Sequence, residues 1–369
     1  MNSYYPAHDD YSAQDARERR RDREVRRARR RRRILLRRLR LLAVFAVIAL
    51  TVTAAFALID RQPEPEAPVA EIPEETIMAA APVPEAEEPE EPAWTIHTTE
   101  NTAQVSADFP SQYVLLLDLE TGEVLAQRDR TARINPASMT KILTLLVSAE
   151  HVTKGALEMG HFTMTRAVAD YTYSNNCSVV GYEVDELIPV KELFYGCILC
   201  SGADACMGLA QTIFGSHEAI VEAMNAKLEE LGLSETSHFT NCVGLYDPNH
   251  YTTVEDMAII MKAALENEFC REVMSTITYQ SVPTAHHPEG QVLSNLFSRR
   301  IQYQDTGAVT VSCAKTGYVE ESGFCAASYG ENTEGRGFIC VTGKSTGTQQ
   351  SIKDHAALYK AYCPGEITE

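Results

Sequence analysis

The hydrophobic and polar positions divide the chain into four stretches. Residues 1–40 are polar and rich in arginine, and residues 41–59 then run for nineteen positions without a charge. Residues 60–93 are rich in proline and glutamate, whereas residues 94–369 mix apolar and polar positions as folded domains do. A nineteen-residue helix is about 28 Å long, close to the thickness of a bilayer's hydrocarbon core. The pattern predicts a disordered basic tail, a membrane-spanning helix, a linker and one globular domain.

The residues flanking the apolar run predict its orientation. The run follows an Arg-rich segment and precedes an acidic one, so the positive-inside rule places the N-terminus in the cytoplasm and everything after Asp60 outside the cell. Ala55-Phe56-Ala57 resembles a signal-peptidase site. The run is nevertheless longer than the apolar core of most cleaved signals and follows a long head. We therefore expect an uncleaved signal-anchor and a single-pass protein of the cell membrane with an extracellular domain.

Strand patterns stand at both ends of residues 94–369, with helical patterns between them. The segments 113–118 and 123–127 are rich in aliphatic residues and flank the turn Leu119-Glu120-Thr121-Gly122, which predicts an antiparallel hairpin. From about 156 to 300 the apolar spacing is mainly helical.

Two of the expected helices carry start signals. Ser216 precedes an amphipathic segment that stops at Gly232, and Thr253 with Asp256 forms a capping box. After the helices the pattern returns to strands. The expected later elements are strands at 308–313, 323–329 and 337–342, and a last helix at 351–362. This order predicts an α+β fold in which both ends of the domain form one antiparallel sheet around a mainly helical insertion.

Composition and charge limit the kinds of partner and ligand that the protein is expected to bind. The formal net charge is −18, although residues 1–59 hold 15 arginines against 6 acidic residues. An acidic domain behind a basic tail argues against nucleic acid as its partner, and the tail beside a membrane span fits anionic lipid better. All ten cysteines follow residue 60, where disulfides are permitted. Cys197 and Cys200 form a CxxC in an apolar run, with no second pair at zinc spacing, so we expect no metal site.

The most informative stretch is 135–141, Asn-Pro-Ala-Ser-Met-Thr-Lys, which leads into an apolar run. Pro136 disfavours helix at the residue before it, so a helix is expected to begin near Ala137 or Ser138. Lys141 then lies on the same helix face as Ser138. A neutral lysine can take the proton of a serine hydroxyl, and burial or a second cation nearby would keep it neutral. By itself the SxxK spacing occurs by chance in many proteins, where it more often reflects a capping serine and a surface lysine than catalysis.

Other stretches give this motif a context. The chain contains, in order, TGEVL, PASMTK, SGADA at 201–205, FTNCVGL with DPNHYTT at 239–253, and KTGYVEESG from Lys315. This ordered set resembles that of the serine D-alanyl-D-alanine carboxypeptidases, the low-molecular-mass penicillin-binding proteins. The resemblance covers about 110–362 and implies a β-lactamase/transpeptidase-like fold.

The resemblance also implies roles for seven residues. In this reading Ser138 is the nucleophile, Lys141 its base and Ser201 a relay for the proton of the leaving amine. The backbone N–H groups of Ser138 and Tyr318 would form the oxyanion hole. The implied catalytic residues are Ser138, Lys141 and Ser201, and the implied substrate-binding residues are Lys315, Thr316, Gly317 and Tyr318.

The implied activity is a serine-type D-Ala-D-Ala carboxypeptidase that trims peptidoglycan stem peptides through an acyl-enzyme. It needs no cofactor, and β-lactam antibiotics are expected to acylate Ser138. The chain departs from the family pattern at Ala203, where the family has asparagine, and at Cys242-Val243, where it has Pro-His. Two alternatives follow: a sensor that binds peptidoglycan or β-lactams with impaired catalysis, and a serine β-lactamase. The histidines, among them His250 and the pair His286-His287, are expected to be structural or on the surface.

Overall fold

The computed structural model describes residues 94–365. The predicted tail at 1–40, membrane span at 41–59 and linker at 60–93 lie outside these residues and stay predictions. Within residues 94–365, no helix is long and apolar enough to cross a membrane.

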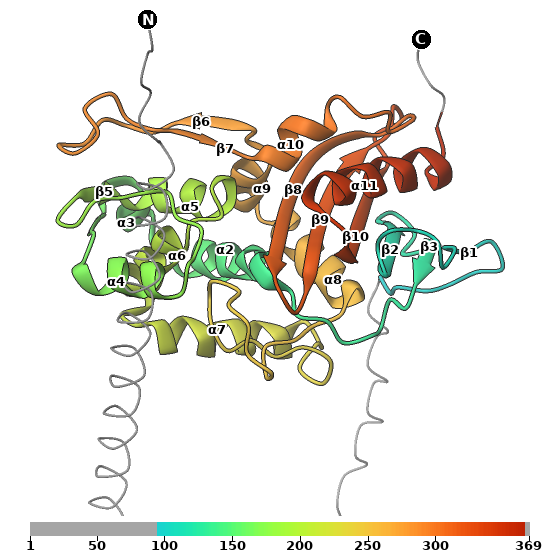
Figure 1. Ribbon diagram of the computed structural model, residues 1–369, viewed down its shortest axis with the longest axis horizontal. Helices are drawn as coiled ribbons and strands as arrows, with labels where there is room; N and C mark the ends of the chain where they lie inside the picture. The colour runs from blue at the N-terminus through green and yellow to red at the C-terminus, as the bar shows by residue number, and fades with distance from the viewer. Residues whose placement is uncertain (1–93, 366–369) are drawn as a thin grey trace, which may run out of the picture. The chain divides into compact units, whose positions relative to one another are not determined.

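The centre of the domain is a six-stranded sheet in the order β1-β3-β2-β10-β9-β8. All its pairings are antiparallel except that of β1 with β3. Figure 1 shows β8, β9 and β10 side by side, with α11 next to them. The edge strand β8 has its last paired residue at Val319. The strands are β1 (Ala103–Gln104), β2 (Tyr113–Asp118), β3 (Val124–Arg128), β8 (Thr310–Val319), β9 (Gly323–Glu331) and β10 (Gly337–Ser345).

Both faces of the sheet are covered, which explains why its strands are apolar at nearly every position. Leu115 and Leu117 of β2 point into a large core shared with the helical part, whereas Val114 and Leu116 point into a second core on the other face. Because side chains alternate along a strand, one run of aliphatic residues supplies both cores. The first face packs against α8 (Val254–Glu266) and the second against α10 (Leu296–Ile301) and α11 (Thr348–Tyr362).

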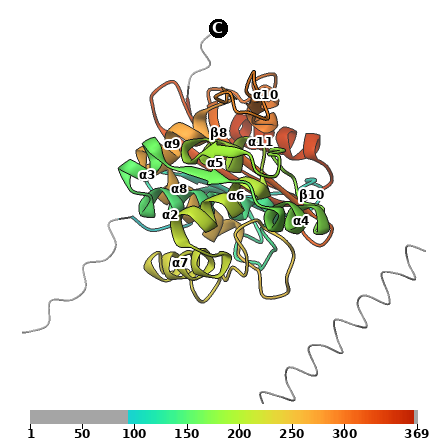
Figure 2. The ribbon, with the colours of Figure 1, turned by 90° about the vertical axis from the view of Figure 1, so that its left-hand side faces the viewer.

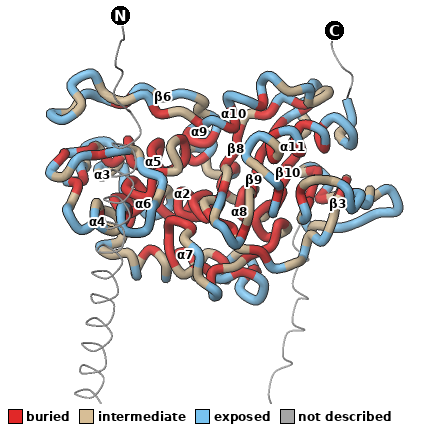
Figure 3. Tube along the Cα trace, in the orientation of Figure 1, coloured by how far each residue is buried: buried red, intermediate tan, exposed pale blue. Residues whose placement is uncertain are grey.

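The helical part fills the chain between β3 and β8. When the left-hand side of Figure 1 faces the viewer, helices α3 to α6 lie in front of the sheet (Figure 2). The most deeply buried of the helices include α2, α5 and α6 (Figure 3). The short pairs β4–β5 (His161–Thr163, Leu187–Pro189) and β6–β7 (Thr278–Gln280, Val292–Ser294) lie within it. The helices are α2 (Thr140–His151), α3 (Lys154–Met159), α4 (Arg166–Ser174), α5 (Val190–Leu199), α6 (Ala203–Leu209), the π-turn η2 (Ala210–Phe214), α7 (His217–Glu230), α8 and α9 (Glu268–Ser275).

The architecture confirms the α+β prediction, with both ends of the domain in one sheet around a helical insertion. The hairpin and the capped helices are also found. The side chain of Ser216 accepts from the N–H of Ala219 at the start of α7, and that of Thr253 accepts from the N–H of Asp256 at the start of α8. The short pairs β4–β5 and β6–β7 were not predicted.

The strand expected at 308–313 is longer than predicted. It runs to Val319, so Lys315, Thr316 and Gly317 lie within β8 and not after a strand. Lysine and glycine have low strand propensity, but these three residues pair with Ala327, Ala326 and Cys325 of β9. Pairing with the neighbouring strand therefore overrides local propensity at this site.

A buried histidine ties α11 to the sheet. His355 is fully buried, and its ring nitrogens lie 2.6 Å from Ser328 Oγ on β9 and 2.9 Å from Thr342 Oγ1 on β10. Burial lowers the pKa of His355 to about 3. The folded protein therefore holds this ring neutral at pH values where an unfolded chain would protonate it.

His355 makes the free energy of unfolding depend on pH. Its stabilising effect is complete above the unfolded pKa of about 6.5 and is lost as the pH falls toward 3. We expect His355→Gln to reduce the slope of the unfolding free energy against pH, between pH 6.5 and 4, by up to about 1.4 kcal/mol per pH unit. Urea unfolding at several pH values measures the slope. The exposed His286→Gln is the matched control; equal slopes in the wild type and His355→Gln would contradict the prediction.

Candidate active site

Ser138 lies in a single tight turn at the start of α2. The α-helix begins at Thr140, and Ser138 belongs to the 3₁₀ turn η1 (Ala137–Met139) that precedes it, so the expected helix start was two to three residues early. The side chain of Asn135 accepts from the N–H of Ala137. Ala137 itself has a φ of +47°, a left-handed conformation that is unfavourable for alanine. The nucleophile candidate is thus presented by a strained turn that its surroundings hold in place.

Lys141 points back at Ser138. Its Nζ donates to Ser138 Oγ at 2.9 Å and to the carbonyl oxygen of Val243 at 2.5 Å, and the residue is 2% exposed. The three-residue spacing on the helix brings the two side chains together. A buried amine in contact with a serine hydroxyl is the arrangement that general-base activation of serine requires.

The loop that holds Lys141 is organised by one buried side chain. Asn241 Oδ1 accepts from the N–H groups of Val243, Gly244 and Leu245. This directs the carbonyl of Val243 at Lys141. The loop therefore serves the site through its backbone, so the replacement of Pro-His by Cys242-Val243 leaves this contact available.

A second serine and lysine form a similar pair. Lys315 Nζ donates to Ser201 Oγ at 2.9 Å and to the carbonyl oxygen of Thr316 at 2.8 Å, and Lys315 is also 2% exposed. Ser201 lies between α5 and α6 with a φ of +55°, again a left-handed residue that is not glycine. Two residues that are 114 positions apart in the sequence are thus brought together by the tertiary fold.

The two lysines influence each other electrostatically. Burial, and to a smaller extent the ammonium of Lys141, lower the pKa of Lys315 to about 7. Two buried ammonium groups that repel each other favour a state in which the pair carries a single proton. Near neutral pH the pair therefore holds fewer protons than two separate, exposed lysines would.

Two adjoining hollows flank Ser138. One has a volume of about 250 Å³ and includes Ser201, Thr316 and Gly317; the other, of about 260 Å³, includes Lys141 and Ala203. The walls of both include Ser138, Asn176, Ser178 and Tyr318. The structure thus brings all seven residues predicted from the sequence to one place: six line these hollows, and Lys315 lies buried behind Ser201.

Position 317 requires a glycine because the Ser138 turn leaves no space for a side chain there. A Cβ at this position would lie 2.7 Å from the carbonyl oxygen of Pro136 and 2.9 Å from the backbone nitrogen of Ser138. On the opposite side, a Cβ at Gly244 would lie 2.8 Å from the same nitrogen. The Ser138 turn is therefore held between two glycines, and β8 reaches the nucleophile's own backbone.

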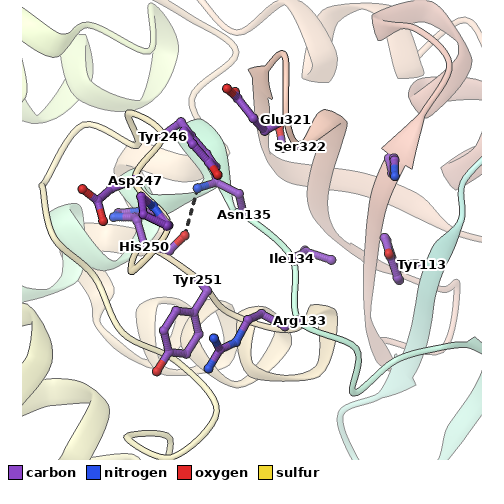
Figure 4. A pocket seen from close by; sticks show the side chains of 12 residues that line it. Tyr113, Arg133, Ile134, Asn135, Tyr246, Asp247, His250, Tyr251, Glu321 and Ser322 are labelled. Carbon is purple, nitrogen blue, oxygen red and sulfur yellow. Dashed lines mark hydrogen bonds between the residues drawn. The ribbon is translucent and has the colours of Figure 1, made fainter.

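A third cavity, of about 360 Å³, is lined by Asn135 and by none of the seven predicted residues. Figure 4 shows the guanidinium of Arg133 against the ring of Tyr251, and the hydrogen bond from Asn135 Nδ2 to the carbonyl oxygen of His250. His250 is buried, with a ring nitrogen 2.8 Å from Thr140 Oγ1. Burial lowers its pKa to about 3, so it is a neutral structural residue, as expected.

Sequence reasoning missed several residues of the two hollows. Asn176 and Ser178 come from the loop after α4, and Thr348 and Ser351 come from the start of α11. A polar run between helices (Asn175-Asn176) was the available signal in the first case, whereas the second depends on how α11 packs. All ten cysteines, which lie within residues 94–365, are free. His287 is less exposed than expected, because it pairs with the buried Glu186.

Comparison with known proteins agrees with the geometry of this site. The profile of the D-alanyl-D-alanine carboxypeptidase family matches residues 98–345, about two thirds of the chain. The chain belongs to this family. The D-alanyl-D-alanine carboxypeptidase DacF of Bacillus subtilis is 33% identical over 239 residues, which cover 65% of this chain and 59% of DacF. The chain spans about half the length of the curated relatives it matches.

Solved structures agree on the fold. A D-alanyl-D-alanine carboxypeptidase of Mycobacterium tuberculosis aligns with a TM-score of 0.60 at 24% identity, covering 71% of this chain and 95% of that one. The Streptomyces K15 DD-transpeptidase aligns with a TM-score of 0.59 at 23% identity, covering 69% and 97%. These likenesses confirm the transpeptidase-like fold expected from the sequence.

The close approach of β8 to the Ser138 turn yields a testable consequence. We expect Gly317→Ala to destabilise the protein by about 1–3 kcal/mol, because the new methyl group has no space beside Pro136 and Ser138. Thermal or urea unfolding measures this loss. The matched control is Gly155→Ala in α3, where nothing lies within 4 Å of the new methyl; it should be neutral or stabilising by up to about 1 kcal/mol. Equal stability of the two variants would contradict the prediction.

Proposed function

We propose that this protein is a serine-type D-Ala-D-Ala carboxypeptidase that trims peptidoglycan stem peptides. The observation that carries the proposal is the presence of two serine–lysine pairs, Ser138 with Lys141 and Ser201 with Lys315, on one cleft. One pair supplies a nucleophile with its base. The other supplies the hydroxyl of Ser201 for the amine of the leaving D-alanine and the cation of Lys315 for its carboxylate.

The first half of the reaction forms an acyl-enzyme. The neutral amine of Lys141 takes the hydroxyl proton of Ser138 as Oγ bonds to the carbonyl carbon between the two terminal D-alanines. The backbone N–H groups of Ser138 and Tyr318 stabilise the negative charge on the carbonyl oxygen. The C–N bond then breaks, and Ser201 relays the proton held by Lys141 to the amine of the departing D-alanine, which leaves Lys141 neutral again.

The second half releases the shortened peptide. A water molecule gives a proton to Lys141 as it attacks the ester carbon, and the Oγ–C bond breaks with the return of a proton to Ser138. No cofactor takes part in this sequence. β-Lactams are expected to acylate the same oxygen, because their strained amide mimics the D-Ala-D-Ala bond.

The substrate's position follows from the charges and from the sheet edge. Its terminal carboxylate would bind near Lys315, with a hydrogen bond from the hydroxyl of Thr316. The remainder of the peptide would lie along β8, which is the edge strand of the sheet, as an added strand. The hollow with Ser201 and Thr316 therefore receives the leaving D-alanine, and the hollow with Lys141 receives the acyl part.

The location proposed for this activity is the outer face of the cell membrane. The support is the uncharged run at 41–59 with its Arg-rich cytoplasmic flank. The proline- and glutamate-rich residues 60–93 would then hold the domain away from the bilayer, by up to about 100 Å if fully extended.

One observation supports a second candidate function. Ala203 offers only a methyl group where the family has an asparagine amide, which would suit a sensor that binds stem peptides or β-lactams without turnover. A sensor is expected to be acylated by penicillin but to release no D-alanine from a pentapeptide. A β-lactamase, in contrast, would hydrolyse penicillin within seconds.

The proposal predicts a complete dependence on one oxygen atom. We expect full-length protein to release D-alanine from a pentapeptide ending in D-Ala-D-Ala and to be labelled by a fluorescent penicillin. Ser138→Ala should abolish both, since the variant lacks the Oγ atom that forms the acyl bond in the proposed mechanism. The exposed Ser234→Ala is the matched control and should retain both. Labelling that persists in Ser138→Ala would refute the assignment.

The lysine pair predicts a pH profile. Burial and the ammonium of Lys141 lower the pKa of Lys315 to about 7, so the coupled lysine pair takes up a proton as the pH falls through this value. A fully protonated pair has no free amine that could act as the base. We expect kcat/KM for D-alanine release to rise about tenfold per pH unit up to about pH 7 and to level off above it. Steady-state assays from pH 5 to 9 measure the profile, and a rate that falls between pH 6 and 8 would contradict it.

A further inference from the structure

One wall of the cleft carries Ala203 at the position where the family has an asparagine amide. The acyl part of a bound peptide presents backbone N–H and C=O groups on two sides. In the proposed binding mode, the edge of β8 would pair with those on one side. On the opposite wall, Ala203 at the start of α6 contributes only a methyl group to the hollow that contains Lys141.

One amide on this opposite wall is free. Asn176 lines both hollows that flank Ser138. Its side chain has no hydrogen-bond partner within residues 94–365, although its backbone N–H donates to the carbonyl oxygen of Tyr173. The φ of Asn176 is +53°, a conformation that asparagine tolerates better than most residues. The side chain carries both a donor and an acceptor, the two kinds of group that a peptide backbone requires.

The loop that carries Asn176 is fixed to the motif that contains Ala203. The buried carboxylate of Asp204 accepts from the N–H groups of Val180 and Gly181, each at 2.9 Å, and the N–H of Ala203 donates to the carbonyl oxygen of Ser178 at 2.8 Å. These bonds tie residues 178–181 to the start of α6. Asn176 is therefore placed on the same wall as Ala203 by a defined structure.

We propose that Asn176 is a substrate-binding residue whose amide holds the peptide backbone of the acyl part, supplying the group that position 203 lacks, with Asp204 as the positioning residue for its loop. This inference rests on the proposed function. In the bound state the Asn176 NH₂ donates to a backbone carbonyl of the substrate, and its carbonyl oxygen accepts from a backbone N–H.

Two variants at this position test the inference in the full-length protein. Asn176→Gly removes the side chain without straining the left-handed backbone. Asn176→Asp keeps the shape but replaces the NH₂ donor with an acceptor. We expect the second-order rate of acylation by fluorescent penicillin, and kcat/KM for D-alanine release from a pentapeptide, to fall about tenfold in both. The melting temperature should change little, which separates a lost contact from a lost fold.

The neighbouring asparagine gives a matched control. Asn175 also lines the hollow that contains Lys141, but its side-chain NH₂ group already donates to the carbonyl oxygen of Tyr171. Asn175→Ala should therefore lower the acylation rate much less than Asn176→Gly. Adding Ala203→Asn to Asn176→Gly should recover activity, because it returns an amide to the same wall.

The outcomes separate this inference from the proposed function. If the wild type is acylated and Ser138→Ala is not, the proposed function stands whatever the Asn176 variants do. Asn176 variants within twofold of the wild type would then overturn the inference alone. An Asn175→Ala loss equal to that of Asn176→Gly, or no recovery on adding Ala203→Asn, would overturn it too.

Discussion

The rest of the site depends on the burial of two lysine amines, each of which donates a hydrogen bond to a serine hydroxyl. Burying an ammonium group is costly, and burying two near each other is more so. The fold accommodates them by giving each a backbone carbonyl, from Val243 and Thr316, and a serine oxygen. The cost of protonating both amines is what leaves a base available near neutral pH. Stability and catalytic chemistry therefore depend on the same contacts.

The surrounding structure keeps these groups in place by close packing. The Ser138 turn is held between Gly317 and Gly244, where any side chain would collide with its backbone. Strain lies at the same place: Ala137, Asn176 and Ser201 have φ values of +47°, +53° and +55°. Such conformations persist only where their neighbours determine them. A cleft between a sheet edge and a helical insertion meets this need, because both of its walls are anchored in a large core.

Much of the fold could be predicted from local patterns. The hairpin of β2 and β3, the capped starts of α7 and α8 and the return to strands near the end each depend on a few neighbouring residues. Ser138 and Lys141 belong to this group as well, because three-residue spacing on a helix brings their side chains together wherever that helix lies. Lys315, Thr316 and Ser201 were found by resemblance of ordered motifs, since their contact spans more than a hundred residues.

The sequence by itself determined the α+β class, the Ser138–Lys141 pair and the set of residues that could carry the chemistry. Tertiary structure decided which groups meet: that Lys315 donates to Ser201, that β8 continues through Gly317, and that Asn176 shares a wall with Ala203. The physical reason is the distance along the sequence over which each interaction acts. Propensity, capping and helix spacing act over a few residues, whereas strand pairing, burial of charge and the Asp204 contacts arise only when distant segments pack together.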